Sequence, residues 1–285
     1  MPGSHRSRHP VHGFTLIELL VVVSIIALLL GVLLPAMSGA RTAALQAVSS
    51  SNLRQLGIAM NVYMDDHDGT MPRSTHFGDG VDSWILTLRP YINAPGTNAS
   101  FGDELDNTAF DRVRLCPADP QGAARLQRGG SSYILNQHLA DAVRDPFTLE
   151  VLSDFSNRRF INCPSCTYTL FIAADGKPAE LAEDHAENLG WQLAPTPASR
   201  WGAVLADIEP GRFGGTGPDV EPSNESGISG EDMLEYERTG RSSYLFFDGH
   251  VASIEAEVLA QLVIAEPFAD FTNPGERQAL AGGLR

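Results

Sequence analysis

Glu18 is the residue whose position most needs a chemical explanation. It is the single charged residue in the apolar run from 14 to 34, FTLIELLVVVSIIALLLGVLL. About 21 residues of α-helix rise roughly 31 Å, which is enough to cross the hydrocarbon core of a bilayer. A carboxylate inside such a span costs about 2.5–3.5 kcal/mol unless a cation meets it. The run therefore predicts a membrane-spanning helix whose one acid must be neutralised by a partner outside its own helix.

A short polar leader, MPGSHRSRHPVHG, precedes this run and contains Arg6 and Arg8 but no acid. Positive charge beside an apolar helix holds that side in the cytoplasm, so we expect the rest of the chain outside the inner membrane. A cut after Gly13 would create a cationic amine on Phe14. If two copies are staggered by about one helical turn, the amine of one copy would reach Glu18 of the other and neutralise its charge. Such a contact runs head to tail and builds an open filament.

Residues 13–18, GFTLIE, placed after a short basic leader, resemble the prepilin signal of type IV pilins and type II secretion pseudopilins. The resemblance implies that prepilin peptidase cleaves after Gly13 and methylates Phe14, and that Glu18 acts in subunit assembly. It also implies homologous pilin or pseudopilin subunits and an inner-membrane assembly platform as partners. The expected function is a structural, non-enzymatic subunit of a type II secretion or type IV pilus-like filament. A membrane-anchored adhesion or ligand-binding protein on a pilin-type stem is the alternative.

A secretory signal peptide is a second explanation of the apolar run, because Ser38-Gly39-Ala40 resembles a small-residue cleavage site. The run is longer than the roughly 7–15 residues of the apolar region in a typical signal peptide, and helical patterning continues past this site. Apolar residues recur mostly three to five positions apart, at Met37, Ala40, Ala44, Val48, Leu53, Leu56, Met60 and Tyr63. We therefore expect one helix over 14–66 that spans the membrane at 14–34, with a kink or local melting at Pro35.

Residues 67–285 are expected to form an extracytoplasmic domain, which gives an α+β, pilin-like fold: the long helix packed on a small antiparallel β-sheet with long loops. Strands are predicted at 131–136, 168–173 and 201–208, and a short helix at 257–264. Residues 243–254 predict a hairpin with a two-residue type I′ turn at Asp248-Gly249. Residues 209–232 contain almost no apolar side chain and predict a mobile surface loop.

The stretch NLRQLGIAMNVYMDDHDGTMP resembles a subgroup of pseudopilin-like proteins in which the helix exit is followed by a Cys-Pro element and a late Asp-Gly-His hairpin. Cys116-Pro117 and residues 248–250 match those two elements. In the subgroup a histidine precedes the Asp-Gly by ten positions, and this chain has Arg238 there. No role is carried over for that histidine.

Charge excludes one class of partner. The chain has 35 acidic against 20 basic residues, for a formal net charge of −15. Binding to nucleic acid needs a dense basic face, and none is visible in the sequence. Loss of the leader would make the chain more acidic still, so assembled copies must offset their repulsion through apolar contacts, ion pairs or bound cations.

No cofactor is expected, although the cysteines and acids leave alternatives open. Cys116, Cys163 and Cys166 predict one disulfide with one thiol left over; a zinc site and a redox-active CPSC motif are the alternatives. Asp65, Asp66 and Asp68 precede Gly69 as a candidate Ca²⁺ loop, but the distal Glu of an EF-hand is missing, and the loop at 209–232 is a second candidate.

The main alternative to a structural protein is an enzyme. Asp248 and His250 are the best candidates for its catalytic residues. We expect the geometry of these two residues, on either side of a turn, to be unsuited to a proton relay. The sequence contains no nucleophile elbow, HExxH motif or phosphate-binding loop. The sequence therefore predicts a protein without enzymatic activity.

Overall fold

The computed structural model describes residues 16–74, 83–92, 109–140, 142–144, 151–178, 184–186, 191, 193–215, 239–265 and 271–274. The chain divides into two compact units, Met1–Thr42 and Ala43–Arg285.

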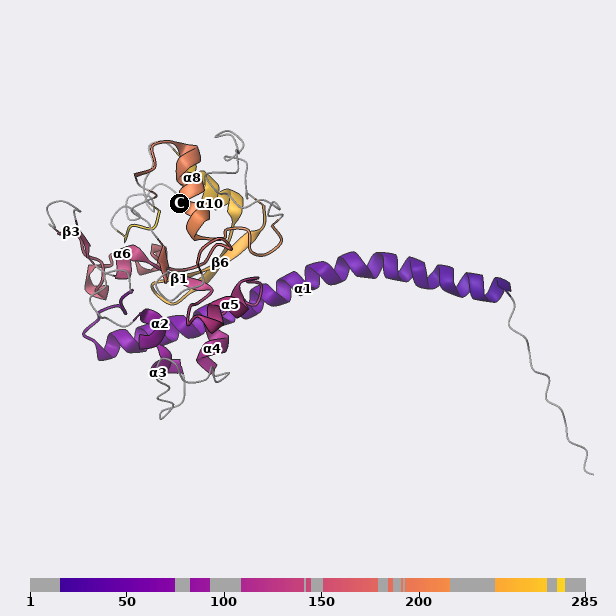
Figure 1. The fold of residues 1–285 in the computed structure, drawn as a ribbon, viewed down its shortest axis with the longest axis horizontal. Helices are drawn as coiled ribbons and strands as arrows, with labels where there is room; N and C mark the ends of the chain where they lie inside the picture. Colours follow the sequence, from indigo (N-terminus) through magenta and orange to yellow (C-terminus); the bar gives the residue numbers. More distant parts are fainter. Residues whose placement is uncertain are drawn as a thin grey trace, which may run out of the picture. The chain divides into compact units, whose positions relative to one another are not determined.

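Helix α1, Leu16–Asp66, begins in the first unit and ends in the second (Figure 1). The chain stays helical through Pro35, so of the two alternatives predicted there local melting is wrong, and the kink stays a prediction. A proline removes one backbone hydrogen bond, and the bonds on either side keep the segment helical. The helix ends at Asp66, as the acidic turn predicts, and the chain then reverses at Asp68 and Gly69, which have φ values of 54° and 82°.

The second unit contains a five-stranded sheet with the order β5-β1-β4-β6-β7. Its strands are β1 Tyr133–Asn136, β4 Tyr168–Ile172, β5 His185–Ala186, β6 Arg241–Phe246 and β7 Val251–Glu255. Four of them pair antiparallel as predicted, whereas β5 pairs parallel with β1. The sheet is therefore mixed. A separate ribbon consists of β2 Val143–Arg144 and β3 Val151–Ser153.

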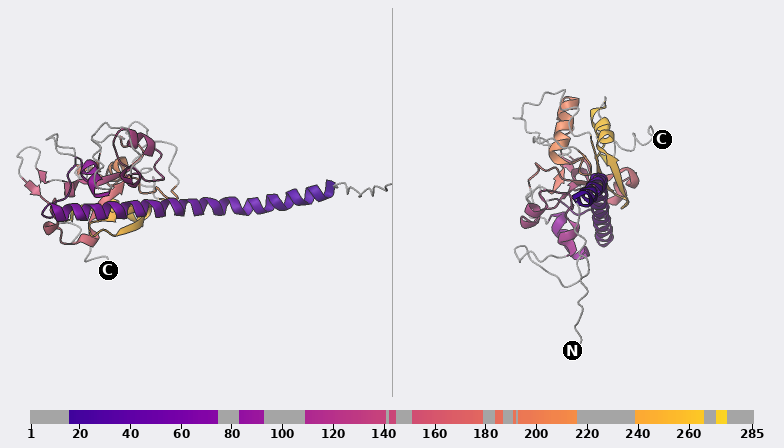
Figure 2. Two further views of the ribbon diagram at one scale, coloured as in Figure 1. Left: turned by 90° about the horizontal axis from the view of Figure 1, so that it is seen from below. Right: turned by 90° about the vertical axis from the view of Figure 1, so that its right-hand side faces the viewer.

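Alternating side chains send the two faces of this sheet into different cores. Tyr133, Leu135 and Leu245 join the buried residues of α1, whereas Ile134, Tyr244 and Phe246 join a second cluster. That second cluster includes helices α8, Pro197–Asp207, and α10, Ala256–Ile264. Within the second unit α1 covers one face of the sheet, and α8 and α10 cover the other, as two further views show (Figure 2).

Short helices fill the connections. They are α2 Trp84–Thr87, α3 Arg89–Ile92, α4 Ala109–Val113, α5 Gly122–Gln127 and α6 Gln137–Ala140, with the 3₁₀ turns η2 Arg158–Phe160 and η3 Pro164–Cys166. The helix predicted at 257–264 is confirmed as α10. The strand predicted at 201–208 is wrong, because α8 occupies most of it. Thr196 caps that helix through Ser199, and Trp201, Val204 and Leu205 are buried at helical spacing.

The predicted hairpin is present as β6 and β7, but its turn differs from the prediction. Gly249 N–H donates to the Phe246 carbonyl at 2.9 Å, and Phe246 N–H donates to the His250 carbonyl at 2.9 Å. Gly249 has a φ of 88°, whereas Asp248 does not adopt positive φ. The loop thus contains three residues, of which the glycine is left-handed. The Asp248 carboxylate accepts the His250 N–H, and this Asx turn stabilises the loop.

Only the first part of the predicted loop at 209–232 falls within the described residues. Phe213 is buried there and forms a bridge with Arg241. The region from 216 to 238, which includes Arg238, lies outside them.

Candidate functional site: the amino-terminal helix

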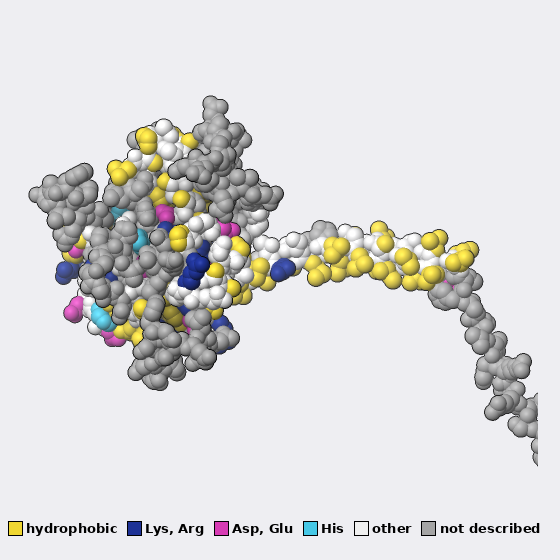
Figure 3. Space-filling model, viewed as in Figure 1, with side chains coloured by type: hydrophobic (Ala, Val, Ile, Leu, Met, Phe, Trp, Pro, Cys, Tyr) yellow, Lys and Arg dark blue, Asp and Glu magenta, His cyan; other side chains and the backbone are white. Residues whose placement is uncertain are grey.

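Residues 16–34 of α1 form the anchor segment. Every described side chain in it is exposed, from Leu16 at 86% to Val22 at 47%. Apolar side chains coat this part of the helix (Figure 3). Among the described residues α1 is the one helix long and apolar enough to cross a membrane. A helix that is apolar on all sides and buried against no protein has lipid as its natural solvent.

Glu18 lies in the first turn of α1 and is exposed. The amino end of a helix has a positive partial charge, so a carboxylate is favoured in its first turn. That effect alone is about 0.3–1 kcal/mol, which is smaller than the cost of a charge in lipid. Gly13 and Phe14, the predicted cleavage residues, lie outside the described residues.

The second half of α1, residues 43–66, has a different character. Leu53, Leu56, Met60 and Met64 are buried in the core that faces the sheet. Hydrogen bonds join this half of the helix to the strands, from Ser49 to Tyr133 at 3.0 Å and from Ser50 to Ser243 at 3.0 Å. The periodicity predicted the buried face, but the polar contacts were not predicted. Ser49, a small polar residue on a mostly apolar face, is the sequence feature that indicates such a contact.

Asn52 is the second polar residue that this face buries. Its amide donates to the carbonyl oxygens of Arg112, at 3.3 Å, and Leu115, at 2.9 Å. Those two carbonyls belong to the segment that leads into the predicted Cys-Pro element. The amide therefore ties that element to α1.

The cysteines are resolved into one disulfide and one free thiol, as predicted. Cys163 and Cys166 are joined, with a Cα–Cα distance of 5.3 Å. Cys116 is free and buried, and burial raises the pKa of its thiol. The zinc site built from three cysteines is wrong, because two of the three thiols are consumed in the disulfide. The CPSC motif forms the 3₁₀ turn η3 and does not open an α-helix as a thioredoxin-like motif does.

The acidic end of α1 forms an ion pair. Asp65 Oδ1 lies 2.5 Å from Arg158 Nη1, and both side chains are largely exposed. Among the residues that the structure describes, no group of three or more His, Cys, Asp or Glu side chains is arranged to hold a metal ion.

Asp248 and His250, the best candidates for a catalytic pair in the sequence, contact each other at the hairpin turn. His250 Nδ1 lies 2.5 Å from Asp248 Oδ1, and the imidazole stacks on Phe246 at a centroid distance of 4.3 Å. The same carboxylate oxygen also accepts the His250 backbone N–H. In the described part of the chain, no Ser, Thr or Cys side chain hydrogen-bonds to this imidazole. The pair fastens the hairpin turn and is not joined to a nucleophile there.

The second unit also buries ion pairs that hold its loops. Lys177 Nζ lies 2.7 Å from Asp207 Oδ1, and the Trp191 indole donates to Asp207 Oδ2 at 2.8 Å. Arg125 Nε lies 2.9 Å from Asp119 Oδ2, and its Nη2 donates to the Ala174 carbonyl at 2.7 Å. These charges meet opposite charges and carbonyls, which is how a folded protein accommodates buried charge. They belong to the architecture of the loop at 174–178.

A family model described as the prokaryotic N-terminal methylation motif matches residues 8–34. The match includes Gly13, Phe14, Glu18 and the whole apolar run, and it does not extend to the hairpin at 248–250. No curated protein and no solved structure matches the chain. The amino-terminal region of this chain is therefore a type IV prepilin-like signal, and it continues into a helix that packs on the mixed sheet of an α+β, pilin-like fold.

Proposed function

We propose that this protein is a structural pilin-like subunit, a pseudopilin, of a type II secretion or type IV pilus-like filament. The observation that supports it most is the continuity of α1. One helix begins in the methylation motif, runs through an exposed apolar segment and then packs into the core of the second unit. A secreted protein that discards its signal peptide has no need for this continuity, because cleavage near Ala40 would sever it.

Processing follows from the motif. Prepilin peptidase cuts after Gly13 on the cytoplasmic side and methylates the amine of Phe14. Residues 1–13 are thus a leader, and the mature chain begins with its membrane-spanning helix. The mature protein is a single-pass protein of the inner membrane, with residues 67–285 outside the cytoplasm.

Assembly depends on Glu18. Its carboxylate is the single charge in an apolar segment, where an unneutralised charge costs about 2.5–3.5 kcal/mol. The amine of Phe14 in an adjoining subunit neutralises it, and the assembly platform of the inner membrane draws such subunits into a filament. The role of the chain in this proposal is structural, and the Asp248–His250 pair has no catalytic part in it.

Mass spectrometry of the native amino terminus tests the proposal most directly. We expect the chain to start at Phe14 with one added methyl group. A chain that starts at Arg41 would identify a secretory signal peptide, and an intact Met1 would identify an uncleaved anchor; either result would refute the proposal. Replacement of Gly13 by Val, with Gly31→Val in the apolar run as the control, should leave a precursor heavier by the leader only in the first variant.

A further inference from the structure

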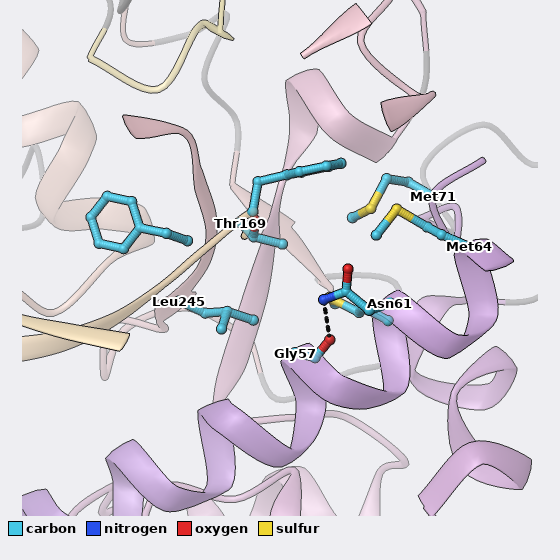
Figure 4. Close-up of a pocket in the computed structure, with 9 residues that line it drawn as sticks. Gly57, Asn61, Met64, Met71, Thr169 and Leu245 are labelled. Atoms are coloured by element: carbon cyan, nitrogen blue, oxygen red, sulfur yellow. Dashed lines mark hydrogen bonds between the residues drawn. The ribbon is translucent and has the colours of Figure 1, made fainter. Parts of the chain in front are cut away.

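A small cavity lies in the second unit where the last three turns of α1 meet strands β4 and β6 (Figure 4). Its volume is about 10 Å³, which is room for the centre of about one water-sized sphere. Met60, Met64 and Met71 all line it, so half of the chain's 6 methionines meet at one small space. All three side chains are buried, with exposed fractions of 2% or less.

The local fold brings the three thioethers together. Met60 and Met64 are four residues apart on α1 and so share one face of the helix. The left-handed residues Asp68 and Gly69 then reverse the chain, and Met71 N–H donates to the Ser156 carbonyl at 2.8 Å. Met64 and Met71 consequently lie next to each other at the cavity, beside the carboxamide of Asn61 (Figure 4).

Two polar side chains also line this cavity. Thr169 is 2% exposed, and its hydroxyl has no hydrogen-bond partner among the described residues. Asn61 donates through Nδ2 to the Gly57 carbonyl at 2.9 Å, which leaves its carbonyl oxygen on the other side of the carboxamide. A buried hydroxyl without a partner is costly, and an occupant of the cavity would relieve that cost.

The electrostatics of the cavity favour a cation. It lies at the carboxyl end of α1, where the helix has a negative partial charge. Asp65, Asp66 and Asp68 follow Met64 within about one turn. None of the described residues that line the cavity is a carboxylate, so hard ions such as Ca²⁺ and Mg²⁺ do not find the charged oxygen ligands they need there.

We infer that this cavity binds a soft monovalent cation of the Cu(I) class through the thioethers of Met60, Met64 and Met71. Thioethers are neutral, polarisable ligands that select Cu(I) over hard divalent ions. The competing explanation is that the three methionines only fill an irregular gap in the core, which is their common use. The two explanations differ in one measurable property, because a gap filler binds no ion and leucine replaces it without consequence.

The test uses the full chain in detergent micelles with Ag(I), which has the same ligand preference and needs no reductant that would open the Cys163–Cys166 disulfide. The methyl groups of methionine are labelled with ¹³C and followed by NMR during the titration. We expect one equivalent of Ag(I) to shift the methyl resonances of Met60, Met64 and Met71 and to leave that of Met37 unchanged. Unshifted resonances of the three buried methionines would overturn the inference, whatever the variants do.

Variants then assign the ligands. Met64→Leu and Met71→Leu keep the side-chain volume and should remain folded, yet lose the one-equivalent binding. Met37→Leu, an exposed methionine of the first unit, and Cys116→Ala, which removes the free thiol, should retain it. Full binding in the Met64→Leu/Met71→Leu double variant would overturn the inference, and so would its loss in Cys116→Ala.

Discussion

The two halves of α1 follow different physical rules although one helical backbone runs through both. Among the described side chains of residues 16–42 none is buried, and the apolar ones point in every direction. In residues 43–66 the buried side chains gather on one face and the opposite face is polar or exposed. The comparison shows that the apolar pattern of a helix matches its surroundings. The first half, apolar on all sides, is suited to lipid, and the second half buries its one apolar face against the sheet.

The same contrast determines what a substitution in each half of the helix disrupts. In the first half the fold of the chain contributes little, and under the proposed function one side chain, Glu18, determines whether subunits assemble. In the second unit many buried contacts share the stability, so each substitution removes a fraction of it. The following predictions run from the largest expected effect to the smallest.

Glu18→Ala should abolish incorporation into filaments while membrane insertion continues. The substitution removes the carboxylate that, in the proposed function, meets the amine of the neighbouring subunit, but it leaves the apolar segment intact. Quantitative immunoblotting of sheared filaments and of membranes measures both steps. Ser24→Ala is the matched control, because Ser24 bonds within its own helix to the Leu20 carbonyl at 2.7 Å. Normal filament yield from Glu18→Ala would break the contrast between the two halves.

Lys177→Ala should lower the free energy of unfolding of the second unit by about 3–5 kcal/mol, because the buried carboxylate of Asp207 loses the ammonium that lies 2.7 Å from it. Chemical denaturation followed by tryptophan fluorescence measures the loss. Arg241→Ala is the control at an ion pair whose side chains are 49% and 61% exposed, and we expect it to cost about 1 kcal/mol or less. Equal costs for the two variants would contradict the prediction.

Leu56→Ala should cost about 2–5 kcal/mol, since Leu56 is fully buried between α1 and the sheet. Leu29→Ala makes the same chemical change in the first half of the helix, where Leu29 is 57% exposed. It should leave the unfolding of the second unit unchanged in detergent. This pair of variants compares the two halves directly, and a destabilising Leu29→Ala would show that the anchor segment also supports the folded unit.

High pH should destabilise the second unit. Burial raises the pKa of Tyr133 and Tyr244 well above their ordinary value near 10. Their contribution to stability is complete below about pH 10 and is lost as the pH rises further, because the unfolded chain ionises first. Denaturation midpoints measured from pH 8 to about pH 11 would reveal the loss.

The two hydroxyls should respond differently to removal. Tyr133 shares a hydrogen bond with Ser49 at 3.0 Å, so Tyr133→Phe should cost about 1 kcal/mol at neutral pH. The Tyr244 hydroxyl has no hydrogen-bond partner among the described residues, so Tyr244→Phe should be neutral at pH 7 and should reduce the loss of stability at high pH. A steeper loss in Tyr244→Phe than in the parent chain would refute the pKa argument.

Local patterns predicted much of the fold. The apolar run, its lone acid and the acidic turn at Asp65 to Gly69 predicted the long helix and its end. The Asp248-Gly249 pair predicted the hairpin, although not its turn, because the Asx bond from Asp248 to the His250 N–H cannot be seen in a dipeptide preference. The strand predicted at 201–208 failed because its apolar residues suit either period over so short a stretch, and the capping residue Thr196 was overlooked.

By itself the sequence determined the anchor and its processing signal, because hydropathy, a single charge and a cleavage motif are properties of neighbouring residues. The tertiary structure alone decided which cysteine stays free, where Lys177 finds Asp207, and that Met71 joins Met60 and Met64 at one cavity. Each of those outcomes requires residues from separate elements to meet. Only the packing of the sheet against its helices specifies such meetings.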